Sequence, residues 1–236
     1  TSKLGSTNTA SLTASNNGTA MAGGDLILNG ISIGASISTS DTASTASGSA
    51  SAIAKAAAVN AVSSQSGVTA TVNATSTTGA AMTIAAVAGT VTINGVTTDT
   101  ITTGGVDATA DRGAVIQAIN EKTGQTGVVA IDTGLSATGI QLVAADGRNI
   151  VVGAFGGTLT SAASGIAAST TSYGTFTLSS SKAIEVTGSA SIANAGVVAG
   201  SYATQTAYSA TTAGTSTAFA AADFKLNGVI LGASLS

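Results

Sequence analysis

Three Asn-Gly dipeptides, each flanked on both sides by apolar residues, constrain most strongly what this chain can fold into. They are Asn29-Gly30, Asn94-Gly95 and Asn227-Gly228. Asn and Gly tolerate positive φ at two successive positions, as the type I′ turn of a two-residue β-hairpin requires. The sequence therefore predicts three β-hairpins with the same design, and so a repeated module.

The apolar residues around each turn fix the register of its hairpin. In a two-residue hairpin, the residues next to the turn pair on one face, as do those two positions further out. The pairs expected on the apolar faces of the first and third hairpins are Leu28 with Ile31, Leu26 with Ile33, Leu226 with Val229, and Phe224 with Leu231.

The first two turns are followed by the same order of elements. Residues 49–64 are rich in Ala and predict a helix that Ser47 or Ser49 could cap, and residues 109–123 predict another that Thr109 or Asp107 could cap. Short alternating or apolar runs then predict strands. They lie at 68–72, with 80–86 as its partner, and at 128–131, 140–143 and 149–152.

These patterns predict an α+β, β-rich fold made of modules of one β-hairpin, one helix and two antiparallel strands. In the region after the second module, 176–178 and 183–186 are expected to be strands that could pair with each other. The expected divisions are an irregular lead-in at 1–24, a first module at 25–90, a second module at 91–154, a variable β and loop region at 155–222, and a hairpin at 223–236 that starts a truncated third module and packs with the N-terminal part.

The composition excludes several classes of partner. Charged residues make up 7% of the chain and the net charge is -3, so seven scattered Lys and Arg form no basic patch for nucleic acid. No run approaches the roughly 18 apolar residues that a membrane-spanning helix needs. The chain has no Cys, which excludes disulfides and thiolate metal sites.

The residues available for chemistry predict no catalytic, cofactor or metal site. Without His or Cys, the commonest general base and zinc ligands are missing. Many of the carboxylates sit next to Gly, Ser or Thr in predicted turns or caps, which favours structural roles there. The carboxylates are Asp25, Asp41, Asp99, Asp107, Asp111, Glu121, Asp132, Asp146, Glu185 and Asp223.

Two weaker alternatives stay open at the level of sequence. Asp99, Asp107 and Asp111 could collect around Ca²⁺, although their spacing is not that of an EF-hand loop. Residues 179–182 match Ser-x-x-Lys once, in a predicted turn. Residues 146–149, Asp-Gly-Arg-Asn, are expected to form a hairpin turn with an exposed Arg.

Several motifs in a fixed order resemble the repeated motif in the middle region of bacterial flagellins, which also occurs in hook-associated proteins. The resemblance covers about 25–186 and the last 13 residues. Its first copy is Leu28-Asn29-Gly30-Ile31, Ala58-Val59-Asn60-Ala61 and Gln65-Ser66-Gly67-Val68-Thr69-Ala70, and its second is Ile93-Asn94-Gly95-Val96, Ala118-Ile119-Asn120 and Gln125-Thr126-Gly127-Val128. The segments 142–150 and 173–178 also resemble strand-turn segments common in flagellins.

The resemblance implies a structural, non-enzymatic protein: the surface-exposed outer domains of a flagellin, extracellular in the flagellar filament. Other flagellin subunits would then be its partners, mainly through terminal helices that this chain lacks, and Ser or Thr could carry O-glycans. The isolated fragment is expected to be a monomer, with no cofactor and no contact with nucleic acid or membrane. The alternatives are a hook-associated or filament-cap protein and a Ser/Thr-rich extracellular adhesin or carbohydrate-binding module.

Overall fold

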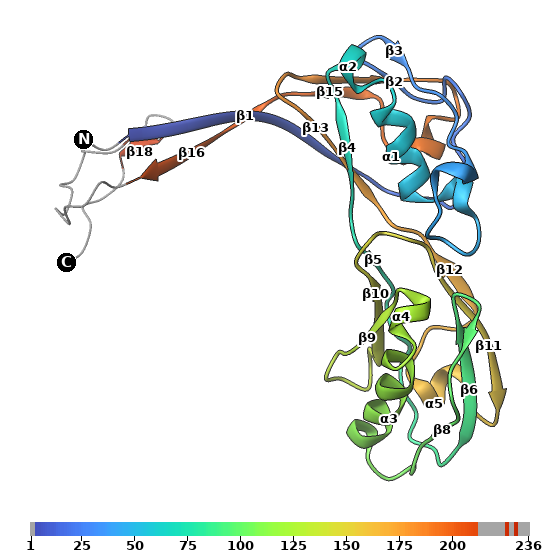
Figure 1. Ribbon diagram of the computed structural model, residues 1–236. Coiled ribbons are helices and arrows are strands. Elements are labelled where there is room, and N and C mark those ends of the chain that lie inside the picture. The colour runs from blue at the N-terminus through green and yellow to red at the C-terminus, as the bar shows by residue number, and fades with distance from the viewer. Residues whose placement is uncertain (1–2, 212–224, 227–228, 231–236) are drawn as a thin grey trace. The chain divides into compact units, whose positions relative to one another are not determined.

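The computed structural model describes residues 3–211, 225–226 and 229–230 (Figure 1). Its strands outnumber its helices and pair in several small antiparallel sheets, which confirms the β-rich α+β fold class. Residues 9–205 form one compact unit, and the described residues on either side of it belong to a second.

Within 9–205 a shared set of elements occurs twice, around two separate hydrophobic cores, and each module adds short elements of its own. The first module contains β2 (Ile27–Leu28), β3 (Ile31–Ser32), α1 (Ala52–Asn60), α2 (Ser63–Ser66), β4 (Thr69–Val72), β13 (Phe176–Ser180), β14 (Ile184–Thr187) and β15 (Gly200–Tyr202). The second contains β5 (Thr75–Ser76), β6 (Ala88–Ile93), β7 (Val96–Thr97), β8 (Ile101–Thr102), α3 (Ala108–Asn120), α4 (Thr123–Thr126), β9 (Val129–Asp132), β10 (Ile140–Ala144), β11 (Ile150–Gly157), α5 (Ser161–Ser164) and β12 (Thr170–Ser172). Three short 3-10 helices lie in the first module, η1 (Ser38–Ser40), η2 (Gly48–Ala50) and η3 (Ile192–Ala195).

The strand order is the same in both modules, as the sequence repeat predicts. One sheet runs β3-β2-β14-β15 in the first module and β7-β6-β11-β12 in the second. The other runs β1-β13-β4 in the first and β5-β10-β9 in the second, where β1 is Lys3–Ala14. Helix α1 packs on β4, and α3 packs on β9. The hairpin and helix of each module are therefore held in the same way.

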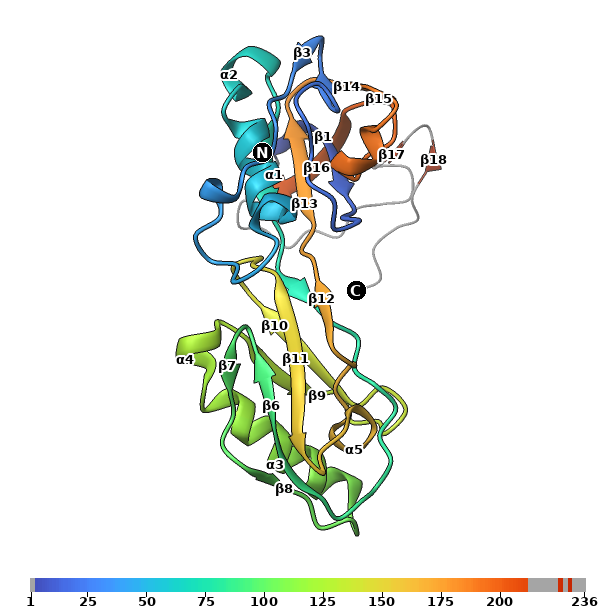
Figure 2. The same cartoon turned by 90° about the vertical axis from the view of Figure 1, so that its right-hand side faces the viewer.

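The second module is inserted into the first. Strands β4 and β13 pair antiparallel, with Val72 opposite Phe176, although the whole second module lies between them in the sequence. Beyond this pair, the amide of Asn73 donates to the carbonyl of Thr175 at 2.9 Å. Figure 1 shows β4 and β13 side by side, and Figure 2 shows β12 leading out of the second module. The strands that complete the first module thus come from residues 176–202.

The Asn-Gly turns have the backbone that was expected. Asn29 and Gly30 have φ of 50° and 81°, and Asn94 and Gly95 have φ of 48° and 80°. The predicted pairing of Leu28 with Ile31 is confirmed, and the amide of Ile33 donates to the carbonyl of Leu26 at 2.9 Å, which places the outer pair together.

The third hairpin is described only in part. Strand β17 (Lys225–Leu226) pairs with β18 (Val229–Ile230), and Leu226 lies opposite Val229 as predicted. The pair of Phe224 with Leu231, the conformation of Gly228, and the expected packing of 223–236 lie outside the described residues.

The predicted helices are confirmed, each with a second short helix after it. The cap of α1 corrects the prediction: Ser51, rather than Ser47 or Ser49, accepts a hydrogen bond from the amide of Ala54 at 3.1 Å. At α3, Asp107 is the cap and accepts from the amide of Thr109 at 2.8 Å. Ser47 and Ser49 were too early because η2 occupies Gly48–Ala50.

Three predictions of strands are wrong. Residues 80–86 form no strand, and the partner of β4 is β13 instead. Strands β13 and β14 do not pair with each other but lie in different sheets. The segment 1–24, expected to be irregular, contains the 12-residue strand β1. Among residues 8–14 of this strand, the buried positions are alanines, Ala10 and Ala14, which give a weak alternating signal in an Ala-rich chain.

Each module contains two asparagines whose side chains bond separate elements together, and each of them has an equivalent in the other module. Asn29 Nδ2 donates to the carbonyl of Ser66 at 2.8 Å, and its Oδ1 accepts from the amide of Glu185 at 2.8 Å. Asn94 makes the same two bonds, to Thr126 and from Val151, at 2.9 and 2.8 Å. Each hairpin is thereby fixed both to the end of the second helix and to the neighbouring strand.

The second pair joins each main helix to the strand it covers. Asn60 donates to the carbonyl of Ala70 at 2.9 Å and accepts from its amide at 2.8 Å. Asn120 does the same with Ala130, at 3.1 and 2.7 Å. Because one side chain bonds both the backbone amide and the backbone carbonyl of one residue, it pairs with the strand as a neighbouring strand would.

The second compact unit contains the beginning of β1 and strand β16 (Gln205–Thr211), which pairs with β1, together with β17 and β18. The chain therefore enters residues 9–205 through β1 and leaves them through β16, which pairs with β1 (Figure 1).

Candidate functional site

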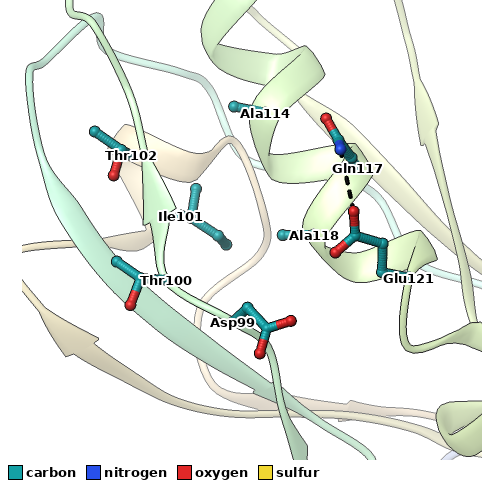
Figure 3. A pocket seen from close by; sticks show the side chains of 8 residues that line it. All are labelled: Asp99, Thr100, Ile101, Thr102, Ala114, Gln117, Ala118 and Glu121. Carbon is teal, nitrogen blue, oxygen red and sulfur yellow. Dashed lines mark hydrogen bonds between the residues drawn. The ribbon is translucent and has the colours of Figure 1, made fainter.

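A small polar pocket lies between α3 and the segment that leads into β8 (Figure 3). Its volume is about 210 Å³, and it is lined by Asp99, Thr100, Ile101, Thr102, Ala114, Gln117, Ala118 and Glu121. Asp99 forms an ion pair with Lys122 at 2.9 Å, and Glu121 accepts from Gln117 at 3.1 Å. Ligand pockets usually range from roughly 300 to 1,000 Å³, so this one suits at most a small polar group.

Most of the carboxylates hold backbone amides. Amide groups donate to Asp25, Asp41, Asp107, Asp111, Asp132 and Asp146. At Asp25, the hydroxyl of Ser189 and the amide of Ala22 lower the carboxyl pKa because they stabilise the charged form. These contacts agree with the interpretation of the carboxylates as caps and turn formers.

The remaining described carboxylates bond to side chains. Asp99 pairs with Lys122, Glu121 accepts from Gln117, and Glu185 accepts from the hydroxyl of Ser201. Asp223 lies outside the described residues.

The alternative of a Ca²⁺ site finds no support in the geometry. Asp111 accepts from the amide of Gly104 at 2.7 Å, Asp107 caps α3, and Asp99 is paired with Lys122. Within the described residues, no three Asp, Glu, His or Cys side chains come together as a metal site would require.

The segment 146–149 differs from the hairpin turn that was expected. It joins β10 and β11, which belong to different sheets, so it is a turn between sheets. Arg148 is only 22% exposed, and it pairs with Asp146 at 2.7 Å. Burial raises the pKa of Asp146, but hydrogen bonds and the positive charge of Arg148 outweigh it and leave the pKa lowered. The side chain packs over Gly127, which a local reading of the sequence could not reveal.

Two buried cations were also missed from the sequence. Arg112 is 3% exposed, and its Nε donates to Asp132 at 2.7 Å. Lys55 is fully buried, and its Nζ donates to Asn16 Oδ1 at 2.8 Å. Burial lowers the pKa of Lys55 to about 8. Both residues sit at helix positions where the Ala-rich or polar surroundings gave no sign of burial.

A larger pocket, of about 490 Å³, lies in the first module where the turn of its hairpin, α2 and the β13–β14 connection meet. It is lined by Asn29, Ser64, Gln65, Ser66, Gly67, Ser180, Ser181, Lys182 and Ala183. It contains Lys182 from the Ser-x-x-Lys match, whereas Ser179 lies within β13, opposite Ser11 and Thr69. The arrangement offers hydroxyls, amides and one ammonium group, but no carboxylate or imidazole to act as a base.

A scan against models of known protein families finds no match, and a search of curated proteins finds no relative. Among the helices of the described residues, none combines the length and the apolar character that crossing a lipid bilayer requires.

Proposed function

We propose that this chain is a structural protein that forms surface-exposed outer domains of a flagellin, the subunit of the bacterial flagellar filament. The observation that carries the proposal is the duplicated module, in which Asn29 and Asn94 hold identical hairpins by identical hydrogen bonds. These asparagines belong to the motifs by which the sequence resembles the middle region of flagellins.

The topology supports a surface domain that is carried by another part of a longer chain. Strand β16 pairs with β1, so the polypeptide enters and leaves residues 9–205 through neighbouring strands. The side chains that could have served chemistry instead hold turns, caps and ion pairs. The proposal includes an extracellular location, no enzymatic activity, and contacts with other flagellin subunits through segments outside this region.

Immunogold electron microscopy tests the proposal. Antibodies raised against the purified 236-residue chain should label flagellar filaments along their whole length on the cells that make the protein. Labelling confined to the hook or the filament tip would instead identify a hook-associated or cap protein. Labelling of the cell surface away from filaments would overturn the proposal in favour of an adhesin.

The state of the isolated chain provides a second check. Sedimentation of the purified chain should show one species near 22.1 kDa, because the proposed filament contacts lie in other segments. Reversible self-association in the micromolar range would mean that this region itself carries assembly contacts.

A further inference from the structure

The residues that line the larger pocket of the first module have equivalents in the second module. In the second module these equivalents fill the corresponding space, whereas in the first module the space is open. Leu142 lies opposite Ala130 and Leu178 lies opposite Ala70, which makes β10 and β13 equivalent. In the strands that follow, Val151 and Glu185 both donate their amides to the hairpin asparagine. Counting back three residues from each, Arg148 in the second module corresponds to Lys182 in the first.

In the second module the side chain of Arg148 occupies the space that is open in the first module. Arg148 donates to the carbonyl of Thr126 at 3.3 Å. Its guanidinium lies directly on Gly127, where an added Cβ would meet the Arg148 Cζ at 2.3 Å. Asp146 holds that guanidinium through Nε at 2.8 Å and Nη2 at 2.7 Å. A cation and its carboxylate therefore fill the space beside the end of α4.

In the first module the same space is open. Gly67 corresponds to Gly127, but nothing lies within 4 Å of a Cβ added there. The connection is two residues shorter, because five residues separate Leu178 from Ile184 and seven separate Leu142 from Ile150. The shorter connection has no counterpart of Asp146, and no ion pair in the described part of the chain involves Lys182.

We propose that this pocket of the first module binds a small polyhydroxylated carboxylate, such as a sugar acid. The ligand's carboxylate takes the role that Asp146 plays in the second module and pairs with the ammonium group of Lys182. The volume of about 490 Å³ accommodates one monosaccharide-sized molecule. This proposal is independent of the flagellar role, since it rests only on the comparison of the two modules.

The lining fits the remaining groups of such a ligand. The exposed hydroxyls of Ser64 and Ser181 can donate and accept hydrogen bonds, and the side-chain amide of Gln65 can do both. Sugar hydroxyls both donate and accept hydrogen bonds, so partners of this dual kind suit them. Ser66 and Ser180 are buried, and their hydroxyls already accept from the amides of Val68 and Lys182. A simple carboxylate would use Lys182 alone and leave the hydroxyl groups bonded to water.

Titration of the ¹⁵N-labelled chain with glucuronate, followed by NMR, tests the proposal. Saturable shifts are expected for the amides of 64–67 and 180–183, with affinity in the millimolar range, about that of a solvent-exposed monosaccharide site. Glucose and acetate serve as partial ligands, and each should bind at least about tenfold more weakly than glucuronate. An oligosaccharide ending in glucuronate, tested in parallel, shows whether the free acid or a chain end is preferred.

Two variants and a control locate the binding. Lys182→Gln should weaken glucuronate binding at least about tenfold, whereas Lys122→Gln, which removes an ammonium group in the second module, should leave it unchanged. Replacing 181–183 by the longer connection 145–149 supplies Asp and Arg within the chain, and it should abolish binding while the spectrum stays folded.

The outcomes are distinguishable. Absence of saturable shifts up to about 50 mM glucuronate, or equal binding by the Lys182→Gln variant, would overturn the proposal. Binding of glucose as strong as that of glucuronate would remove the role of the carboxylate. Equally strong binding of acetate would reduce the pocket to a plain anion site and would overturn the sugar-acid assignment.

Discussion

At the scale of single residues, asparagine does more of the structural work than its place in turns predicts. Asn94 is 3% exposed and satisfies two backbone groups that would otherwise be buried without partners. Burying an unpaired amide or carbonyl costs free energy of about 1–3 kcal/mol. The same side chain thus supports the positive φ of the turn and bonds two other elements to it.

Replacing Asn94 by Gly separates these two roles. Gly keeps the positive φ, so the loss comes from the two missing side-chain bonds, and the free energy of unfolding should fall by about 2 kcal/mol in urea denaturation. Asn17→Gly, at an exposed loop position that bonds only the nearby amide of Thr19, is the matched control and should cost less than about 1 kcal/mol. Equal stability of Asn94→Gly and wild type would show that the two side-chain hydrogen bonds of Asn94 do not stabilise the fold.

Lys55 makes the stability depend on pH in a predictable direction. Its pKa is about 8 in the folded chain and 10.5 without burial, so the unfolded state binds more protons between these values. Stability should therefore rise from about pH 8 to 10.5, by roughly 3 kcal/mol, as the buried ammonium loses its charge. Below pH 8 both states are protonated and the cost of burying the charge is fully present.

The Lys55→Met variant isolates this contribution. Urea denaturation of wild type and variant at several pH values should give curves whose difference changes over this interval and is flat below it. A difference that stays constant from pH 7 to pH 10.5 would show that Lys55 keeps its charge in the folded chain or reaches solvent.

At the scale of elements, the hairpin turn is the feature that local sequence determines best. Gly30 has φ of 81°, yet a Cβ added there meets nothing within 4 Å, so any cost of a side chain comes from the backbone conformation. Gly30→Val should lower the free energy of unfolding by about 1–2 kcal/mol, measured by thermal or urea denaturation.

Gly34 provides the control for that substitution. It lies in the same segment, has equally open surroundings, and does not have a positive φ. Gly34→Val should therefore change stability by less than about 0.5 kcal/mol. If the two valine variants were equally destabilised, sterics or strand propensity rather than the turn would be responsible.

The same reasoning explains how much could be predicted from sequence. Turns and helices depend on neighbours in the chain, so the Asn-Gly hairpins and both main helices were predicted. Strand pairing across the inserted module depends on contacts such as Val72 with Phe176, for which neither segment carries a distinctive local signal. The larger pocket was not predicted either, because its opening depends on a two-residue difference between connections that only equivalent positions in space reveal.

At the scale of the whole molecule, the nested arrangement predicts that the modules can be separated. The amide of Asn73 bonds the carbonyl of Thr175, so the points where the second module begins and ends are already adjacent. Replacing 74–174 by a two-residue Asn-Gly turn should convert β4 and β13 into an ordinary hairpin. The shortened chain should keep a cooperative thermal transition, because its core is formed without the inserted residues.

The excised segment supplies the complementary measurement. Residues 74–174 contain every buried member of the second core, so the isolated segment should also melt cooperatively and give dispersed NMR spectra. Some loss of stability is expected in both pieces, since Asn149 bonds the carbonyls of Ala46 and Ser47 in the intact chain. A disordered excised segment would mean that the two modules fold only together.

The loop between β9 and β10 is a second place in this fold at which a segment can be inserted. It corresponds to the connection in the first module that carries the entire second module, but here it spans only 133–139. Leu135 in this loop is 62% exposed, and the flanking strands already hold their register. We therefore expect that a foreign peptide, or another copy of the module, can be inserted at Leu135 for display without a change to the residues of either hydrophobic core.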